Sequence, residues 1–181
     1  ARLLPRPGHM EARRSPSFTP RRVFGSALCV ILVGVALHFA YRWSGRSPVA
    51  GIFASVNEST WQHLKLAFWP MLLIAPVQWV VYGRPPGWLP ATAVRTLTAP
   101  LLIIALFYGY TALLGTHALP LDLTVYAVSV LGGEVLGHLV MDRAFPRWVR
   151  VAAGSAILAV AAAMATFTFL PPDWFLFEPP G

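Results

Sequence analysis

Residues 121–142 read L-D-L-T-V-Y-A-V-S-V-L-G-G-E-V-L-G-H-L-V-M-D, and the rest of the chain can be placed around this stretch. It is long enough to cross a bilayer as a helix, yet it carries Glu134 and His138 well inside. Charged side chains at membrane depth are costly, so they face a bundle interior and have partners. Spacing of four residues puts Glu134, His138 and Asp142 on one helical face. A neighbouring stripe of small residues, where another helix can approach closely, consists of Ser129, Gly133 and Gly137.

Composition places the chain in the membrane. Of its 181 residues, 56% are hydrophobic and 12% are charged, whereas a soluble domain has about 25% charged residues. The net charge of +7 comes almost wholly from arginines. Because these cluster outside the hydrophobic segments, they indicate orientation and contact with anionic lipid rather than nucleic acid. The single cysteine, Cys29, excludes an internal disulfide framework.

The hydrophobic segments predict an all-α bundle of five transmembrane helices. The first covers 23–41, the second runs from the stretch 57–65 to about 82, and the others cover 88–114, 121–142 and 151–170. This divides the chain into a basic arm (1–22), a transmembrane domain (23–170) and a short proline-rich acidic tail (171–181). Four prolines predict that the arm is extended rather than helical. We expect it to lie along anionic lipid or a partner subunit.

Arginine placement predicts the orientation. With the N-terminus in the cytoplasm, the inner segments hold Arg2, Arg6, Arg13, Arg14, Arg21, Arg22, Arg84, Arg143, Arg147 and Arg150. The outer segments hold Arg42 and Arg46, with Lys65 at a helix end. This asymmetry follows the positive-inside rule and puts the C-terminus outside.

The stretch 57–65 reads N-E-S-T-W-Q-H-L-K and has two interpretations. As a helix start, Asn57 or Ser59 is the cap, Glu58 suits the positive helix end, and Trp61 anchors at the membrane interface. This capping account is the one we favour. Alternatively, Glu58 and His63, with His38 near the same side, bind a metal ion.

The same stretch, followed by F-W-P at 68–70, resembles an uncharacterised family of small bacterial polytopic membrane proteins. The signature of that domain of unknown function is similar to N-E-S-x-W-E-H-L-K, and its ending is similar to Pro171-Pro172 followed by Leu176-Phe177. Gln62 stands where the signature has an acidic residue, which argues against a two-carboxylate site. The resemblance implies a bacterial cytoplasmic (inner) membrane location and implies no activity.

Buried charges suggest a polar group inside the bundle. Arg95 lies seven residues into its helix and Glu134 lies eight residues from the end of the next, roughly 10 and 12 Å from the same side at 1.5 Å per residue. We therefore expect Arg95 to pair with Glu134, with His138 completing the group. In the competing interpretation, Arg95 extends to the inner headgroups and Glu134 is protonated.

Other chemistry is open at these residues. The E-x-x-x-H pattern of Glu134 and His138 could ligate a metal or relay a proton, but a structural contact that sets helix register is the simpler interpretation. His38 or His138 alone could be an axial ligand to haem or chlorophyll. The sequence requires no cofactor, and it contains no G-x-S-x-G, H-E-x-x-H, P-loop or CxxC motif.

Two function classes follow. The first is a non-catalytic accessory subunit of a larger membrane complex, such as a photosynthetic or respiratory assembly, with other membrane subunits as partners. Its support is small size and close-packing faces, including Ser155, Ala159 and Ala163 on the last helix. The alternative is a stand-alone small transporter or metal- or proton-handling protein that uses Glu134, His138 and Arg95.

Overall fold

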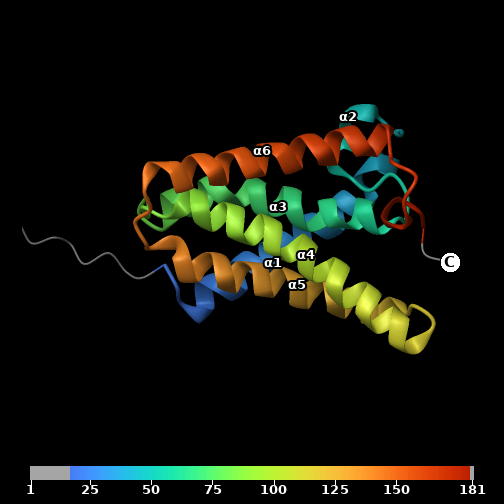
Figure 1. Cartoon of the computed structure of the whole chain (residues 1–181), viewed down its shortest axis with the longest axis horizontal. Coiled ribbons are helices and arrows are strands. Elements are labelled where there is room, and N and C mark those ends of the chain that lie inside the picture. Colours follow the sequence, from blue (N-terminus) through green and yellow to red (C-terminus); the bar gives the residue numbers. More distant parts are fainter. Residues whose placement is uncertain (1–16, 180–181) are drawn as a thin grey trace, which may run out of the picture.

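The structure, a computed structural model, describes residues 17–179 and is built of helices (Figure 1). In chain order these are α1 (Pro20–Trp43), α2 (Pro48–Phe53), α3 (Thr60–Val81), α4 (Trp88–Leu114), α5 (Leu119–Met141), α6 (Arg147–Phe169) and the 3-10 turn η1 (Phe175–Phe177). All helices except α2 and η1 are long and apolar enough to cross a membrane. This confirms the predicted all-α bundle with five transmembrane helices.

Helix α3 lies in the middle of the bundle. In its most apolar stretch 56% of the residues are buried, against 17–33% in the other four long helices. It packs against α1 and α4, while α4 also packs against α5 and α6, and α1 against α5. In Figure 1 the tip of the α4–α5 hairpin (yellow) projects away from the neighbouring helix ends.

Successive long helices run in opposite directions, so the bundle has two distinct ends. The arginine end holds the start of α1, the α3–α4 turn and the α5–α6 turn, on the left in Figure 1. The α2 end holds α2, the start of α3, the α4–α5 turn and η1. Every candidate site residue can be assigned to one of these ends or to the interior between them.

Small residues of α5 allow close contact with α4. A Cβ added at Gly133 would lie 3.0 Å from the carbonyl oxygen of Arg95, and one at Gly137 would lie 3.1 Å from that of Ala91. Ser129, on the same stripe, is fully buried. The stripe that the sequence places beside Glu134 therefore faces α4, and it brings the α5 backbone next to Arg95.

The basic arm ends earlier than predicted. Helix α1 begins at Pro20, so Arg21 and Arg22 are helical, and the prediction of an extended arm through residue 22 is wrong there. The reason is local: Thr19 is the N-cap and accepts from the backbone N–H of Arg22, and proline suits the first helical turn. Residues 1–16, and with them most of the predicted arm, lie outside the described residues.

Two short elements were not predicted. The connection 42–56 contains α2, which begins at a proline in the favoured first-turn position. The tail contains η1, whose Leu176 is buried. Helices α5 and α6 also begin earlier than expected, because Pro120 is accommodated in the first turn of α5 and Pro146 is the N-cap of α6.

The small residues of α6 do not face the bundle. Its buried positions are Ile157, Met164 and Thr168, whereas Ser155 and Ala159 are exposed. The close-packing face predicted on α6 is thus exposed at two of its three positions, and its role in assembly stays a prediction. The buried contact of α6 is made by larger side chains, mainly against α4.

Candidate functional site

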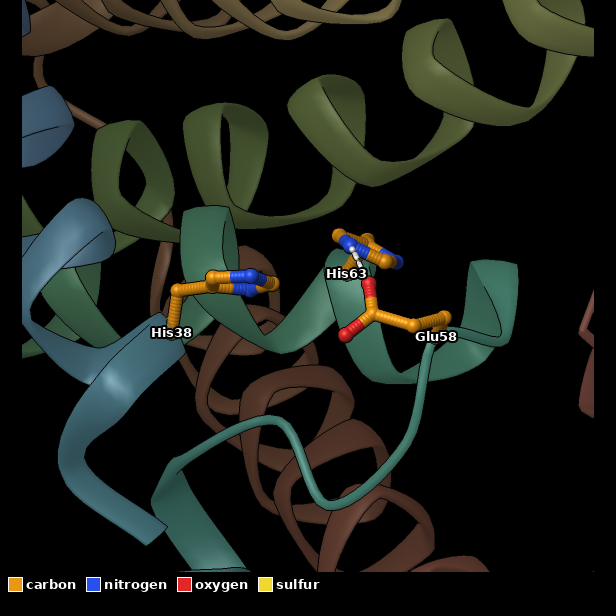
Figure 2. A group of neighbouring side chains, drawn as sticks. All are labelled: His38, Glu58 and His63. Carbon is orange, nitrogen blue, oxygen red and sulfur yellow. Dashed lines mark ion pairs between the residues drawn. The ribbon is translucent and has the colours of Figure 1, made fainter. Parts of the chain in front are cut away.

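Three metal-ligating side chains converge at the α2 end. His38 comes from α1, Glu58 from the loop before α3, and His63 from the first turns of α3. One ligand atom from each lies within 4.8 Å of the other two. Figure 2 shows the two imidazole rings and the carboxylate directed toward the same space. We call this set the His38–Glu58–His63 cluster.

A tight turn positions Glu58. The side-chain oxygen of Asn57 accepts from the backbone N–H of Ser59 at 2.9 Å, and Ser55 Oγ donates to the carbonyl of Asn57 at 2.6 Å. Ser59 is the N-cap residue of α3, but its hydroxyl makes no capping hydrogen bond. The capping prediction is therefore wrong in its mechanism. Asn57 and Ser59 shape the turn that places Glu58 beside His63.

Hydrogen bonding orients His63 as a metal ligand. Its Nδ1 lies 2.9 Å from the carbonyl oxygen of Ser59, so Nδ1–H donates and Nε2 is the ring nitrogen left to face the cluster. That Nε2 lies 3.4 Å from Glu58 Oε2. A backbone carbonyl that holds the second ring nitrogen is the usual support of a metal-ligating histidine.

His38 completes the cluster from the opposite helix. Its ring centroid lies 5.5 Å from that of His63, with the planes tilted by 31°. Among the described residues nothing hydrogen-bonds its buried Nδ1. A buried polar nitrogen without a partner is costly, and a bound ion would remove this cost.

The cluster has the right chemistry for a divalent transition metal. Two imidazoles and one carboxylate form a common catalytic zinc set, with a fourth position open. Donor atoms of a tetrahedral zinc site lie about 3.4 Å apart, because each is about 2.1 Å from the metal. Glu58 and His63 already have this separation. The Glu58 side chain is 65% exposed and can follow a shift of His63 toward His38.

Two cavities meet at the cluster. The larger, about 500 Å³, lies between α1, α3, α4 and α5, and has mostly apolar walls. The smaller, about 370 Å³, is polar and is lined by Arg42 and Arg46 among others. His38 and Glu58 line both cavities. The cluster therefore stands between a polar space and an apolar one.

A second pair of polar residues lines the larger cavity. His117 Nδ1 lies 3.2 Å from Asp122 Oδ2, and the Tyr110 hydroxyl also donates to the Asp122 carboxylate. These residues belong to the α4–α5 hairpin. The sequence alone does not indicate this pair, since a spacing of five residues across a helix start gives no recognisable motif.

Trp61 packs against the C-terminal part of the chain at the α2 end. Its ring packs against Phe177 of η1, at a centroid distance of 4.9 Å, and against Phe167 of α6, at 5.6 Å. These contacts arise because η1 returns to cover the start of α3, and the interface anchor stays a prediction. Trp61 holds the C-terminal segment on the bundle.

Arg95, Glu134 and His138, which the sequence places at a similar depth, lie together inside the bundle. Arg95 Nη1 lies 3.8 Å from Glu134 Oε2, and both side chains are fully buried. His138 Nδ1 lies 2.8 Å from the carbonyl oxygen of Glu134 and 3.4 Å from its Oε2. The headgroup interpretation of Arg95 is wrong, because its side chain points into the bundle.

The sequence did not indicate three neutral residues that also hydrogen-bond within the Arg95–Glu134 group. Gln78 donates to Glu134 Oε2 at 3.4 Å and to Ser26 Oγ at 2.8 Å. Thr92 accepts from Arg95 at 3.1 Å. Neutral residues in apolar helices carry no charge signal that would indicate a partner on another helix, so the sequence alone did not identify them.

Lys65 was also misplaced. It lies inside α3 rather than at its end, is fully buried, and donates to the carbonyl of Gly51 at 2.7 Å and to Thr168 Oγ1 at 3.0 Å. Gln62, which departs from the motif, is buried and accepts weakly from Val56 N–H at 3.4 Å. An acidic residue at position 62 is thus not needed for the three-residue cluster.

The two histidines considered as single axial ligands of haem or chlorophyll, His38 and His138, have different surroundings. His138 is 1% exposed, and its ring lies 5.6 Å from that of Tyr82. Neither of the two cavities described above reaches it. His38 does border a cavity, but it shares that space with Glu58 and His63. The geometry thus favours an ion at His38 over a large planar cofactor.

Comparison with known proteins gives a family and no activity. The profile of a family of unknown function, DUF6512, matches residues 13–179. The chain belongs to this family. The match confirms the resemblance to a family of unknown function, while the exact signature and the bacterial source stay predictions. No curated protein and no solved structure matches this DUF6512 chain significantly.

Proposed function

We propose that this DUF6512 protein binds a divalent transition-metal ion, with zinc the best fit, through His38, Glu58 and His63. The observation that carries the proposal is the convergence of three donor groups from α1, the loop before α3, and α3 itself. The turn before α3 brings Glu58 to His63, and the packing of α1 against α3 brings His38 to both. The hydrogen bond from His63 to Ser59 supports ligation by Nε2.

The proposed ion has a position open for another ligand. Three protein ligands leave a tetrahedral ion one free site, and in zinc proteins such a site binds water or substrate. The two cavities give this position access to both polar and apolar molecules. This supports a metal-handling or metal-dependent role over a purely structural ion.

Metal content and affinity test the proposal. Protein purified without chelator is analysed for metals, and zinc is titrated calorimetrically into the metal-free protein. We expect one zinc per chain, with affinity reduced by about 10–100-fold or more in His63→Ala and Glu58→Gln. His117→Ala is the matched control, because it lines the same cavity outside the cluster. Absence of stoichiometric zinc, or equal affinity in His63→Ala, would overturn the proposal.

The arginine distribution supports an orientation for this site. Among the described residues, Arg84, Arg143 and Arg147 lie at the arginine end and Arg42 and Arg46 at the α2 end. We infer a cytoplasmic arginine end, an outward-facing cluster, and a bacterial inner membrane as the location. In a Cys29→Ser background, Ser44→Cys should react with an impermeant thiol reagent on intact cells and Pro86→Cys should not. The reverse pattern would invert the topology.

A second candidate function is that of an accessory subunit in a larger membrane complex. The exposed small residues Ser155 and Ala159 on α6 favour it, because such faces let another membrane helix approach closely. Native gels in gentle detergent, followed by mass spectrometry, test this. Migration with a large complex supports it, whereas a lone monomer or homodimer rules it out. Metal binding is compatible with either outcome.

The alternative of a transporter or proton-handling protein built on Arg95, Glu134 and His138 has weaker support. Neither of the two cavities reaches these residues. Their hydrogen bonds connect α3, α4 and α5. We therefore propose a structural role for this group.

A further inference from the structure

The larger cavity has the dimensions of a ligand site. Its volume of about 500 Å³ lies within the range of pockets that bind small molecules, about 300–1,000 Å³. Its walls are mostly aliphatic and aromatic, with the His38–Glu58–His63 cluster on one side. Among the lining residues, the Tyr126 hydroxyl donates to the carbonyl of Leu66 at 2.8 Å, next to Gly34. A ligand here needs one polar end and an apolar remainder.

The cavity is bordered by exposed apolar side chains. Of its lining residues, Val35 and Phe39 on α1 and Leu119 and Leu123 on α5 are exposed large hydrophobic side chains. They lie on two helices long and apolar enough to span a membrane. The space between these helices is therefore bordered by surfaces that suit acyl chains, so a molecule dissolved in the bilayer can reach it sideways.

Charge favours an anionic group at the polar end. A divalent ion with two neutral imidazoles and one carboxylate retains a net charge of about +1. Arg42 and Arg46 line the polar cavity that shares His38 and Glu58. The other acid of the larger cavity, Asp122, is already engaged by His117 and Tyr110. An anionic head at the cluster would meet positive charge, and the negative charge of Asp122 is already paired.

We propose that the larger cavity binds a single-chain amphiphile with an anionic, metal-ligating head, such as a fatty carboxylate, taken from the outer leaflet. The head would occupy the fourth position of the ion proposed above, and the chain would lie along α1 and α5. This inference rests on the proposed metal site and adds the ligand class. The depth of the cavity along α5, from Leu119 to Tyr126, is roughly 10 Å at 1.5 Å per residue.

The probe is laurate, and the protein is used whole in nanodiscs. Binding of labelled laurate is measured with zinc and after zinc removal, with empty nanodiscs as background. Acetate supplies the head without the chain, and dodecanol supplies the chain without the head. We expect saturable laurate binding that zinc strengthens by about tenfold or more, the effect of one contact with a charged group. Acetate and dodecanol should not compete at equal concentration.

Variants separate the cavity from the ion. Leu123→Trp fills the cavity without touching the cluster and should abolish laurate binding while zinc binding stays unchanged. Leu136→Trp, on the same helix and also exposed (44% against 56% for Leu123) but outside the cavity, is the control and should change neither. Zinc binding without laurate binding would overturn this inference alone. Laurate binding unaffected by zinc, or by Leu123→Trp, would also overturn it. Absence of zinc binding would instead refute the proposed function.

Discussion

The buried Arg95–Glu134 contact is expected from the positions of the two residues along their helices, and its contribution to the free energy of unfolding can be measured. Arg95→Met and Glu134→Gln remove each charge with little change in volume, and the double variant removes both. Each single variant leaves the other charge fully buried, while Gln78 continues to hydrogen-bond position 134. The expected outcome is strong coupling between the two substitutions.

The distance between Arg95 and Glu134 sets the expected size of this coupling. At 3.8 Å, two unit charges interact by about 4 kcal/mol at an effective dielectric constant near 20. Removing one partner of a buried pair destabilises by about 3–5 kcal/mol, because an uncompensated charge stays inside. The double variant carries no such charge. We therefore expect it to be no less stable than the worse single variant, and at least about 2 kcal/mol more stable than additivity predicts.

Unfolding free energies from denaturant titration in mixed micelles measure this coupling. The control cycle combines Arg95→Met with Trp61→Ala at the α2 end, roughly 25 Å away along the bundle axis by helix rise. That cycle should be additive within about 0.5 kcal/mol. If the Arg95 and Glu134 substitutions are equally additive, the two side chains do not interact in the membrane, and the argument from shared depth fails.

Two packing predictions use matched controls and the same unfolding assay. A Cβ at Gly34 would collide with the Tyr126 hydroxyl, so Gly34→Ala should destabilise by about 1–3 kcal/mol. The control is Gly109→Ala, where no atom lies within 4 Å, and it should change stability by less than about 1 kcal/mol. Similar values for the two variants would contradict the close contact between Gly34 and Tyr126. Trp61→Ala should cost about 3–5 kcal/mol and expose the segment 171–179 to protease. Trp148→Ala, 72% exposed, should do neither; an unchanged cleavage rate in Trp61→Ala would show that η1 is held by other contacts.

Helix existence and length were predictable, because they follow from hydrophobic runs that each residue contributes to locally. The bounds of α4, 88–114, agree with the structure at both ends. Errors concentrate at helix starts. Prolines at positions 20, 48 and 120 look like breakers in sequence, yet each lies in a first turn where its missing N–H has no cost.

The site was predictable in part. Glu58 and His63 share a motif, and His38 lies on the predicted same side, so the sequence alone indicates a metal cluster as one of two interpretations. The preference for capping was reasonable because Ser59 does occupy the N-cap position. Its hydroxyl makes no capping bond, and only the folded arrangement shows that Ser59 instead offers its carbonyl to His63.

Sequence was therefore sufficient for what depends on residues near one another in the chain: the membrane class, the five spans, the small face of α5 and the shared depth of Arg95 and Glu134. Contacts between distant helices required the tertiary structure. It brought Lys65 to Thr168, Gln78 to Glu134 and Trp61 to Phe177, and it opened the cavity beside His38. The physical reason is that depth along a helix follows from residue number, whereas the direction in which a side chain points depends on helix rotation and tilt, and these are set by packing against every neighbour at once.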